Sequence, residues 1–112
     1  MTTIPCIVTA GLLAEAIPHS CTRCLVALLL QQATGHRWDI HRRHTVRRGT
    51  GIRLEGYRAY DLDDAHTPAW DFPPSLVRLV NDFDASWERE TFLGMVIQIP
   101  ARLVPQPEKE AT

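Results

Sequence analysis

The stretch SCTRCLVALLLQQATG, residues 20–35, decides how the rest of the chain has to pack. Ser20 is a typical N-cap residue, and Gly35 is the residue type that most often ends a helix in the left-handed conformation. Between them, apolar side chains cover most sides of the expected helix, namely Leu25, Val26, Leu28, Leu29, Leu30 and Ala33. A helix that is apolar all round belongs in the middle of a core. We therefore predict a central helix from Cys21 to about Thr34.

The segment that follows this helix alternates between apolar and polar residues, as Trp38 and Ile40 alternate with Asp39 and His41. Two glycines within residues 47–51 permit the positive φ angles of a hairpin turn. We therefore predict a β-hairpin over 36–60. The face toward the helix is expected to hold the even-numbered residues Trp38, Ile40, Val46, Ile52 and Leu54. The face toward water is expected to hold Arg43, Arg53 and Tyr57.

The flanking segments carry weaker signals. Residues 4–8 are β-prone, and Thr9 is placed to cap a short helix that Pro18 ends. Residues 61–74 are acidic and broken by prolines, which predicts a loop. Ser75 then caps a helix whose apolar residues recur at i, i+3, i+4 and i+7, namely Leu76, Leu79, Val80 and Phe83. A final strand is indicated by the alternating residues Met95, Ile97 and Ile99.

These elements predict an α+β fold. We expect a small antiparallel or mixed sheet of three to four strands, made of the hairpin 36–60 plus the C-terminal strand and packed on one face by two to three helices. The 112 residues have the usual size of one domain, so we predict a single domain over 1–104 and a frayed polar tail over 105–112. Residues 85–92 fit a helix and a strand equally well.

Composition narrows the class of protein. Apolar residues make up 45% and charged residues 22%, which is typical of globular domains. The longest apolar run, Cys24–Leu30, is far shorter than the ~20 residues of a membrane span. The first five residues show no basic region before an apolar segment, and the cysteines number three. We therefore expect no membrane association, no secretory signal and a cytoplasmic location with reduced thiols.

Charge is strongly segregated along the chain. Residues 36–60 hold seven arginines against Asp39 and Glu55, a net charge of +5, whereas residues 61–90 hold eight acidic residues against two arginines, a net charge of −6. The basic segment is expected either to bind an external anionic partner or to be neutralised by the acidic segment of the same chain. Both alternatives fit the sequence.

An external partner of the basic hairpin would be nucleic acid. The planar fork of arginine suits phosphate, aromatic rings add stacking surface, and a two-stranded ribbon fits a DNA major groove. The candidate binding residues are Arg37, Arg42, Arg43, Arg47, Arg48, Arg53 and Tyr57.

We therefore predict a small non-enzymatic binding or regulatory module that acts by surface electrostatics on nucleic acid or on a nucleic-acid-handling protein. In the second case the acidic face would occupy a basic groove of the partner. Arginine outnumbers lysine eleven to one, which indicates a bacterium with a GC-rich genome or its phage. We expect no cofactor.

The pair Cys21-x-x-Cys24 supports two rival interpretations. A helix start favours a thiolate, so a thiol-redox enzyme centred on Cys24 is one alternative. A zinc site is the other, with the ligands Cys21, Cys24, His36 and His41. Their spacing is one residue short of a zinc finger, and the order of hairpin and helix is reversed. We therefore expect Cys24 to be a core residue and Cys21 a residue of the first turn of the helix.

A third interpretation is a cysteine hydrolase. Cys24 opens an apolar helix, and Ala65-His66 and Trp70-Asp71 follow downstream. This arrangement resembles the transglutaminase-like peptidases that trim the leaders of lasso peptides. The resemblance covers two short patches, and it implies Cys24 as nucleophile, His66 as base and Asp71 as the orienting acid. Thr67-Pro68 interrupts the motif around the histidine.

Overall fold

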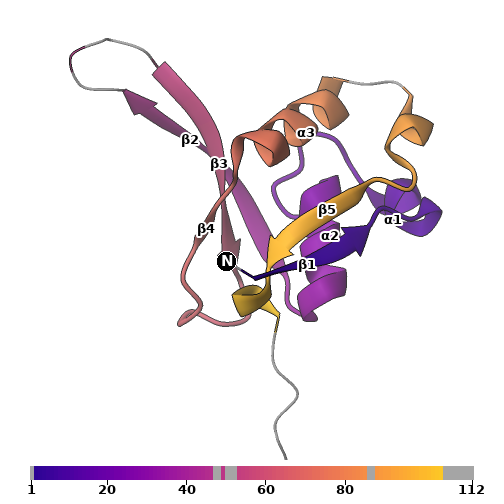
Figure 1. The fold of residues 1–112 in the computed structure, drawn as a ribbon, viewed down its shortest axis with the longest axis horizontal. Helices are drawn as coiled ribbons and strands as arrows, with labels where there is room; N and C mark the ends of the chain where they lie inside the picture. Colours follow the sequence, from indigo (N-terminus) through magenta and orange to yellow (C-terminus); the bar gives the residue numbers. More distant parts are fainter. Residues whose placement is uncertain (1, 47–48, 50–52, 86–87, 105–112) are drawn as a thin grey trace, which may run out of the picture.

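The computed structural model describes residues 2–46, 49, 53–85 and 88–104, and for residues 44–46 and 53–55 it describes the backbone alone. The elements in chain order are β1 (Thr3–Ile7), α1 (Ala10–Glu15), α2 (Leu25–Thr34), β2 (Trp38–Val46), β3 (Arg53–Asp61), β4 (Trp70–Asp71), α3 (Pro74–Ala85), the 3-10 helix η1 (Arg89–Phe92), β5 (Val96–Pro100) and the 3-10 helix η2 (Ala101–Leu103). The strands form two antiparallel sheets, β1–β5 and β2–β3–β4 (Figure 1). The predicted α+β class is confirmed.

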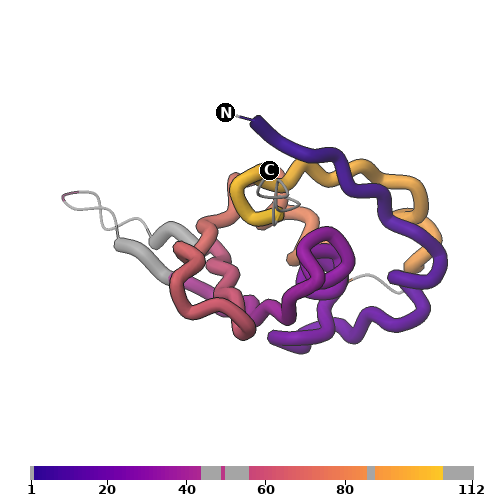
Figure 2. The backbone as a smooth tube through the Cα atoms, turned by 90° about the horizontal axis from the view of Figure 1, so that it is seen from below, coloured from indigo at the N-terminus to yellow at the C-terminus, as the bar shows by residue number. Residues whose placement is uncertain are grey.

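Helix α2 is the buried centre of the molecule, as predicted. All of its residues from Leu25 to Leu30 are buried. Seen end-on in Figure 2, α2 lies between β1–β5 on one side and β2–β3 on the other. Because a sheet covers each side, apolar residues are needed around most of its circumference.

The ends of α2 differ in how well the sequence predicts them. Gly35 ends the helix with a φ of 77°, which confirms its predicted role. The helix begins at Leu25 and not at Cys21, because residues 21–24 form a turn. In this turn the Ser20 hydroxyl accepts a hydrogen bond of 3.1 Å from the Arg23 amide. The Ser20 side chain thus closes a local turn, and the helix begins only after it.

The predicted hairpin is confirmed, but the predicted side of the sheet for Tyr57 is not. Its register pairs even-numbered residues of β2 with odd-numbered residues of β3, such as Ile40 with Ala59 and Arg42 with Tyr57. Directly opposed residues share a face of the sheet, so the prediction that Tyr57 faces water is wrong. Tyr57 is buried beside Ile40, and its hydroxyl donates to Asn81 Oδ1 of α3 over 2.6 Å. The side chains of Val46, Ile52, Arg53 and Leu54 lie outside the described residues.

A buried polar link joins the hairpin to α2. Trp38 faces the core as predicted, and its indole Nε1 donates to the Thr34 hydroxyl over 2.8 Å. That hydroxyl in turn donates to the Leu30 carbonyl over 2.7 Å. The hydrogen bonds from Trp38 to α2 and from Tyr57 to α3 place both helices on the same face of this sheet.

The C-terminal strand β5 does not extend the hairpin, contrary to the predicted single sheet. It pairs with β1, and Ile97 and Ile99 face inward as predicted. The edges of the hairpin are occupied near its base: the Ile40 amide of β2 donates to the Cys21 carbonyl over 2.7 Å, and β4 pairs with β3. Both edges of the hairpin base thus have partners, and β5 pairs with β1 instead.

Helix α3 buries the predicted stripe of Leu76, Leu79, Val80 and Phe83. It begins at Pro74, one residue before the predicted cap Ser75, because proline suits the first position of a helix. The predicted loop 61–74 contains the short strand β4, which buries Trp70. Within the described ranges, no helix is long and apolar enough to cross a bilayer.

Candidate functional site

The base of the hairpin is neutralised by aspartates of the acidic segment. Arg37 donates to Asp63 Oδ1 from Nη2 over 2.8 Å and from Nε over 3.1 Å, while its backbone amide donates to Oδ2 over 2.7 Å. These hydrogen bonds from Arg37 lower the pKa of Asp63. Arg37, a predicted phosphate ligand, therefore already holds a carboxylate.

Asp71 neutralises two further arginines. Arg58 donates to its two carboxylate oxygens over 2.6 and 3.1 Å, and Arg43 Nη1 donates to Oδ2 over 2.9 Å. The hydrogen bond from Arg58 is the main reason that the pKa of Asp71 is lowered. The side chain of Asp71 is 56% exposed, so both ion pairs lie at the surface.

Arg42 and Tyr57 form a stacked pair on the inner face of the hairpin. The Arg42 guanidinium lies 5.9 Å from the centre of the Tyr57 ring. Tyr57 is buried, so the expected stacking platform for a base is occupied by the protein itself. Among the described aromatic residues of the hairpin, Tyr60 is the exposed one.

The distal part of the hairpin holds the remaining predicted binding residues. Arg47 and Arg48 lie outside the described residues, and for Arg53 the backbone alone is described. The strands that lead to them are defined, because β2 and β3 pair up to Val46 and Arg53. Figure 1 shows these strands extending beyond the helices at one side of the molecule.

The three predicted hydrolase residues lie in different environments. Cys24 is buried, and burial raises the pKa of its thiol. His66 is exposed, with its backbone amide bonded to Asp64, and Asp71 is engaged by Arg43 and Arg58. No hydrogen bond or ion pair among the described residues joins the three. The thiolate that nucleophilic attack requires is therefore disfavoured at Cys24.

The predicted zinc ligands separate into three places. His36 Nδ1 lies 2.7 Å from Asp61 Oδ2, and this hydrogen bond raises the pKa of His36. Cys24 is buried at the start of α2, whereas Cys21 and His41 are exposed and close to each other. The structure thus brings together two of the four predicted ligands.

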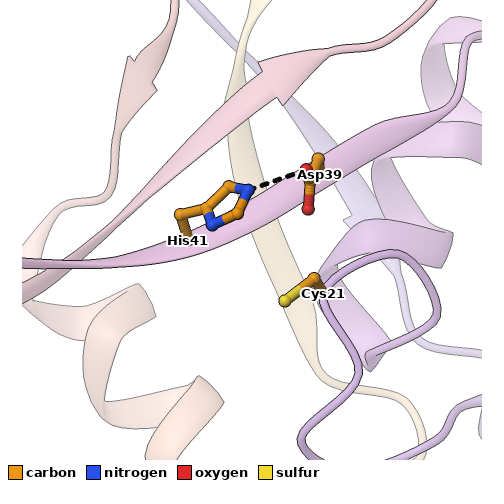
Figure 3. Close-up of side chains that lie close together, drawn as sticks. All are labelled: Cys21, Asp39 and His41. Atoms are coloured by element: carbon orange, nitrogen blue, oxygen red, sulfur yellow. Dashed lines mark hydrogen bonds and ion pairs between the residues drawn. The ribbon is translucent and has the colours of Figure 1, made fainter.

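Asp39 joins Cys21 and His41, and sequence reasoning missed it as a partner. Asp39 Oδ2 lies 2.7 Å from His41 Nε2, and potential ligand atoms of all three residues lie within 4.8 Å of one another (Figure 3). Residues two apart on a strand share a face, so the alternation already placed Asp39 beside His41. The approach of Cys21 had no sequence signal, because it depends on how the turn at 21–24 docks against β2.

The fold thus presents two candidate functional surfaces. One is the basic hairpin, and the other is the cluster of Cys21, Asp39 and His41. Comparisons with known protein families, with curated proteins and with solved structures found no significant match.

Proposed function

We propose that the chain is a small, non-enzymatic binding module that contacts nucleic acid through the distal part of its β2–β3 hairpin. The observation that carries the proposal is the extension of β2 and β3 beyond the helices, toward a segment rich in arginine. A two-stranded ribbon of this kind has the width to enter a major groove.

The distribution of charge supports the distal part rather than the base as the contact surface. Arg37, Arg43 and Arg58 are held by aspartates. Residues 44–55 add three arginines against Glu55, a net charge of +2 in sequence. We infer that Arg47, Arg48 and Arg53 neutralise phosphates. We propose that the chain is a cytoplasmic protein of a bacterium or phage and that it regulates nucleic acid through this contact.

An enzyme centred on Cys24 has less support. Its thiol is buried with a raised pKa, and the nearby charge of Asp84 raises that pKa further. Both effects oppose formation of the nucleophile. A binding role requires none of this chemistry.

Salt dependence tests the proposal. Three phosphate contacts predict a slope of about −2.7 in a plot of log affinity against log salt on duplex DNA, or about a 40-fold loss for a fourfold rise in salt. Replacing Arg47 and Arg48 with glutamate should remove most of this binding while leaving the circular dichroism spectrum unchanged. Fluorescence anisotropy with a labelled duplex measures both effects.

The matched control is the reversal of Arg23 and Arg78, two exposed arginines outside the hairpin. This variant has the same net charge as the hairpin variant. The proposal requires that the control keeps its affinity. Equal losses in the two variants would show a diffuse charge effect, and absence of wild-type binding to duplex DNA, single-stranded DNA and RNA at low salt would refute nucleic acid as the partner.

A further inference from the structure

We propose that Cys21, Asp39 and His41 form a binding site for a divalent transition-metal cation, with Zn²⁺ as the best match. The site lies on the outer face of β2 at the base of the hairpin. It does not depend on the binding of nucleic acid, because none of the three residues belongs to the distal segment.

Backbone contacts place the three side chains together. The Ile40 amide donates to the Cys21 carbonyl over 2.7 Å, which fixes the turn at 21–24 against the edge of β2. Asp39 and His41 flank Ile40 in sequence, and they face away from the core because Ile40 faces into it. Figure 3 shows Cys21 reaching the strand from the preceding turn, next to the pair formed by Asp39 and His41.

The separations suit a metal centre. Bonds of about 2.3 Å from zinc to sulfur and about 2.0 Å to nitrogen place the ligand atoms of a tetrahedral site about 3.5 Å apart. The potential ligand atoms of Cys21, Asp39 and His41 lie within 4.8 Å of one another before any adjustment. Small side-chain rotations can therefore close the site, and the exposure of Cys21 and His41 leaves room for them.

The donor set selects the class of cation. A thiolate and an imidazole favour zinc over magnesium and calcium, which prefer oxygen ligands. Thiolate and carboxylate together carry a charge of −2, so a divalent ion leaves the site neutral once the thiol proton has been released. Three protein ligands with an exposed side leave a fourth position for water or for a ligand from a partner.

The neighbouring residues hold the ligands in place and leave them accessible. The Tyr60 ring packs edge-on against the His41 ring, with 5.7 Å between centroids. Arg58 lies opposite His41 in the register, and its guanidinium is engaged by Asp71, which compensates its positive charge. Before a cation binds, the His41 ring is thus oriented by the Tyr60 ring on one side and by Asp39 on the other.

Titration of the metal-free, reduced full chain with Co²⁺ and then Zn²⁺ tests the site. We expect one equivalent of Co²⁺ to produce a thiolate charge-transfer absorption and the strong visible bands of tetrahedral coordination, and Zn²⁺ to displace both. The variants Cys21→Ser, Asp39→Asn and His41→Ala should each weaken binding about 100-fold or more, beyond the 10- to 100-fold cost of losing an outer-shell partner.

Two controls separate this site from the ligand set that the sequence spacing indicates. Cys24→Ala and His36→Gln should keep wild-type affinity, because neither side chain belongs to the proposed cluster. Loss of binding in these controls, or full binding in Asp39→Asn, would refute the assignment. So would a Co²⁺ spectrum without thiolate absorption. Circular dichroism of each apo variant establishes that the chain has folded, and Asp39→Asn serves as the decisive variant if Cys21→Ser does not fold.

Discussion

Single aspartates determine the environment of several charged residues in the basic segment. Asp61 is the clearest case, because its side chain is only 1% exposed. One of its oxygens accepts hydrogen bonds from the amides of Asp63 and Asp64, and the other faces His36 Nδ1. This carboxylate thus organises the start of the acidic loop and holds the histidine that follows α2.

The bond between His36 and Asp61 predicts a pH-dependent stability. The hydrogen bond to Asp61 raises the pKa of His36 above its ordinary value of about 6.5. The protonated form is therefore favoured by folding. Its contribution to the free energy of unfolding is fully present below about pH 6.5 and is lost as the pH rises through the raised pKa.

Urea unfolding of wild type and His36→Gln across pH 5 to 9 measures this contribution. We expect the difference between the two free energies of unfolding to shrink as the pH rises through that window. Other titrating groups are common to both proteins and cancel in the difference. A difference that does not vary with pH would contradict the bond, as would an NMR titration that gives His36 an ordinary pKa.

Among the elements, α2 is expected to contribute most to stability, because sheets pack against it on two sides. Leu29 and Leu30 of this helix are almost fully buried, and its Thr34 hydroxyl accepts the hydrogen bond from the Trp38 indole. A cavity in such a place has neighbours on every side that cannot all move to fill it.

Leu29→Ala is therefore expected to lower the free energy of unfolding by about 2–5 kcal/mol. Leu93→Ala is the matched control, since Leu93 is 53% exposed and should change stability by less than about 0.5 kcal/mol. Chemical denaturation of both variants measures the two values. Similar losses for the two substitutions would place the core elsewhere than around α2.

For the whole molecule, the oppositely charged segments of the chain fold against each other. Asp63 holds Arg37, and Asp71 holds Arg43 and Arg58. Of the two alternatives that the sequence left open, neutralisation within the chain is present at the base of the hairpin. Binding to an external anion is the proposed role of the distal segment.

Asp71→Asn tests how the two roles are balanced. The substitution removes the carboxylate that competes with phosphate for Arg43 and Arg58. We expect tighter binding to duplex DNA and a salt slope steeper by about 0.9 to 1.8. The cost in stability should stay below about 1 kcal/mol, because the ion pairs are exposed.

Asp82→Asn is the control for this change, as Asp82 is exposed on α3 and carries the same charge. Anisotropy titrations at several salt concentrations compare the two variants. If both bind DNA equally well, net charge and not the release of Arg43 and Arg58 would govern affinity. If Asp71→Asn binds no more tightly than wild type, Arg43 and Arg58 do not meet phosphate when they are released.

Local patterns in the sequence predicted several elements correctly. The apolar residues of α2, the stripe of α3 and the left-handed Gly35 were recognisable because caps and periodicity act over a few neighbouring residues. The face of Tyr57 was not recognisable, because it depends on register. A shift of one residue moves a side chain to the opposite face of a strand.

The candidate site likewise combines features that the sequence predicts with features that it does not. The sequence by itself determined the chemistry available, namely an arginine-rich hairpin, an acidic segment, and the alternation that places Asp39 and His41 on one face. Only the tertiary structure decided that Cys21 joins this pair, that Asp63 and Asp71 hold three of the arginines, and that β5 pairs with β1. These outcomes depend on contacts between segments far apart in the chain, which local periodicity and capping do not encode, because each contact is selected by the packing of the whole core.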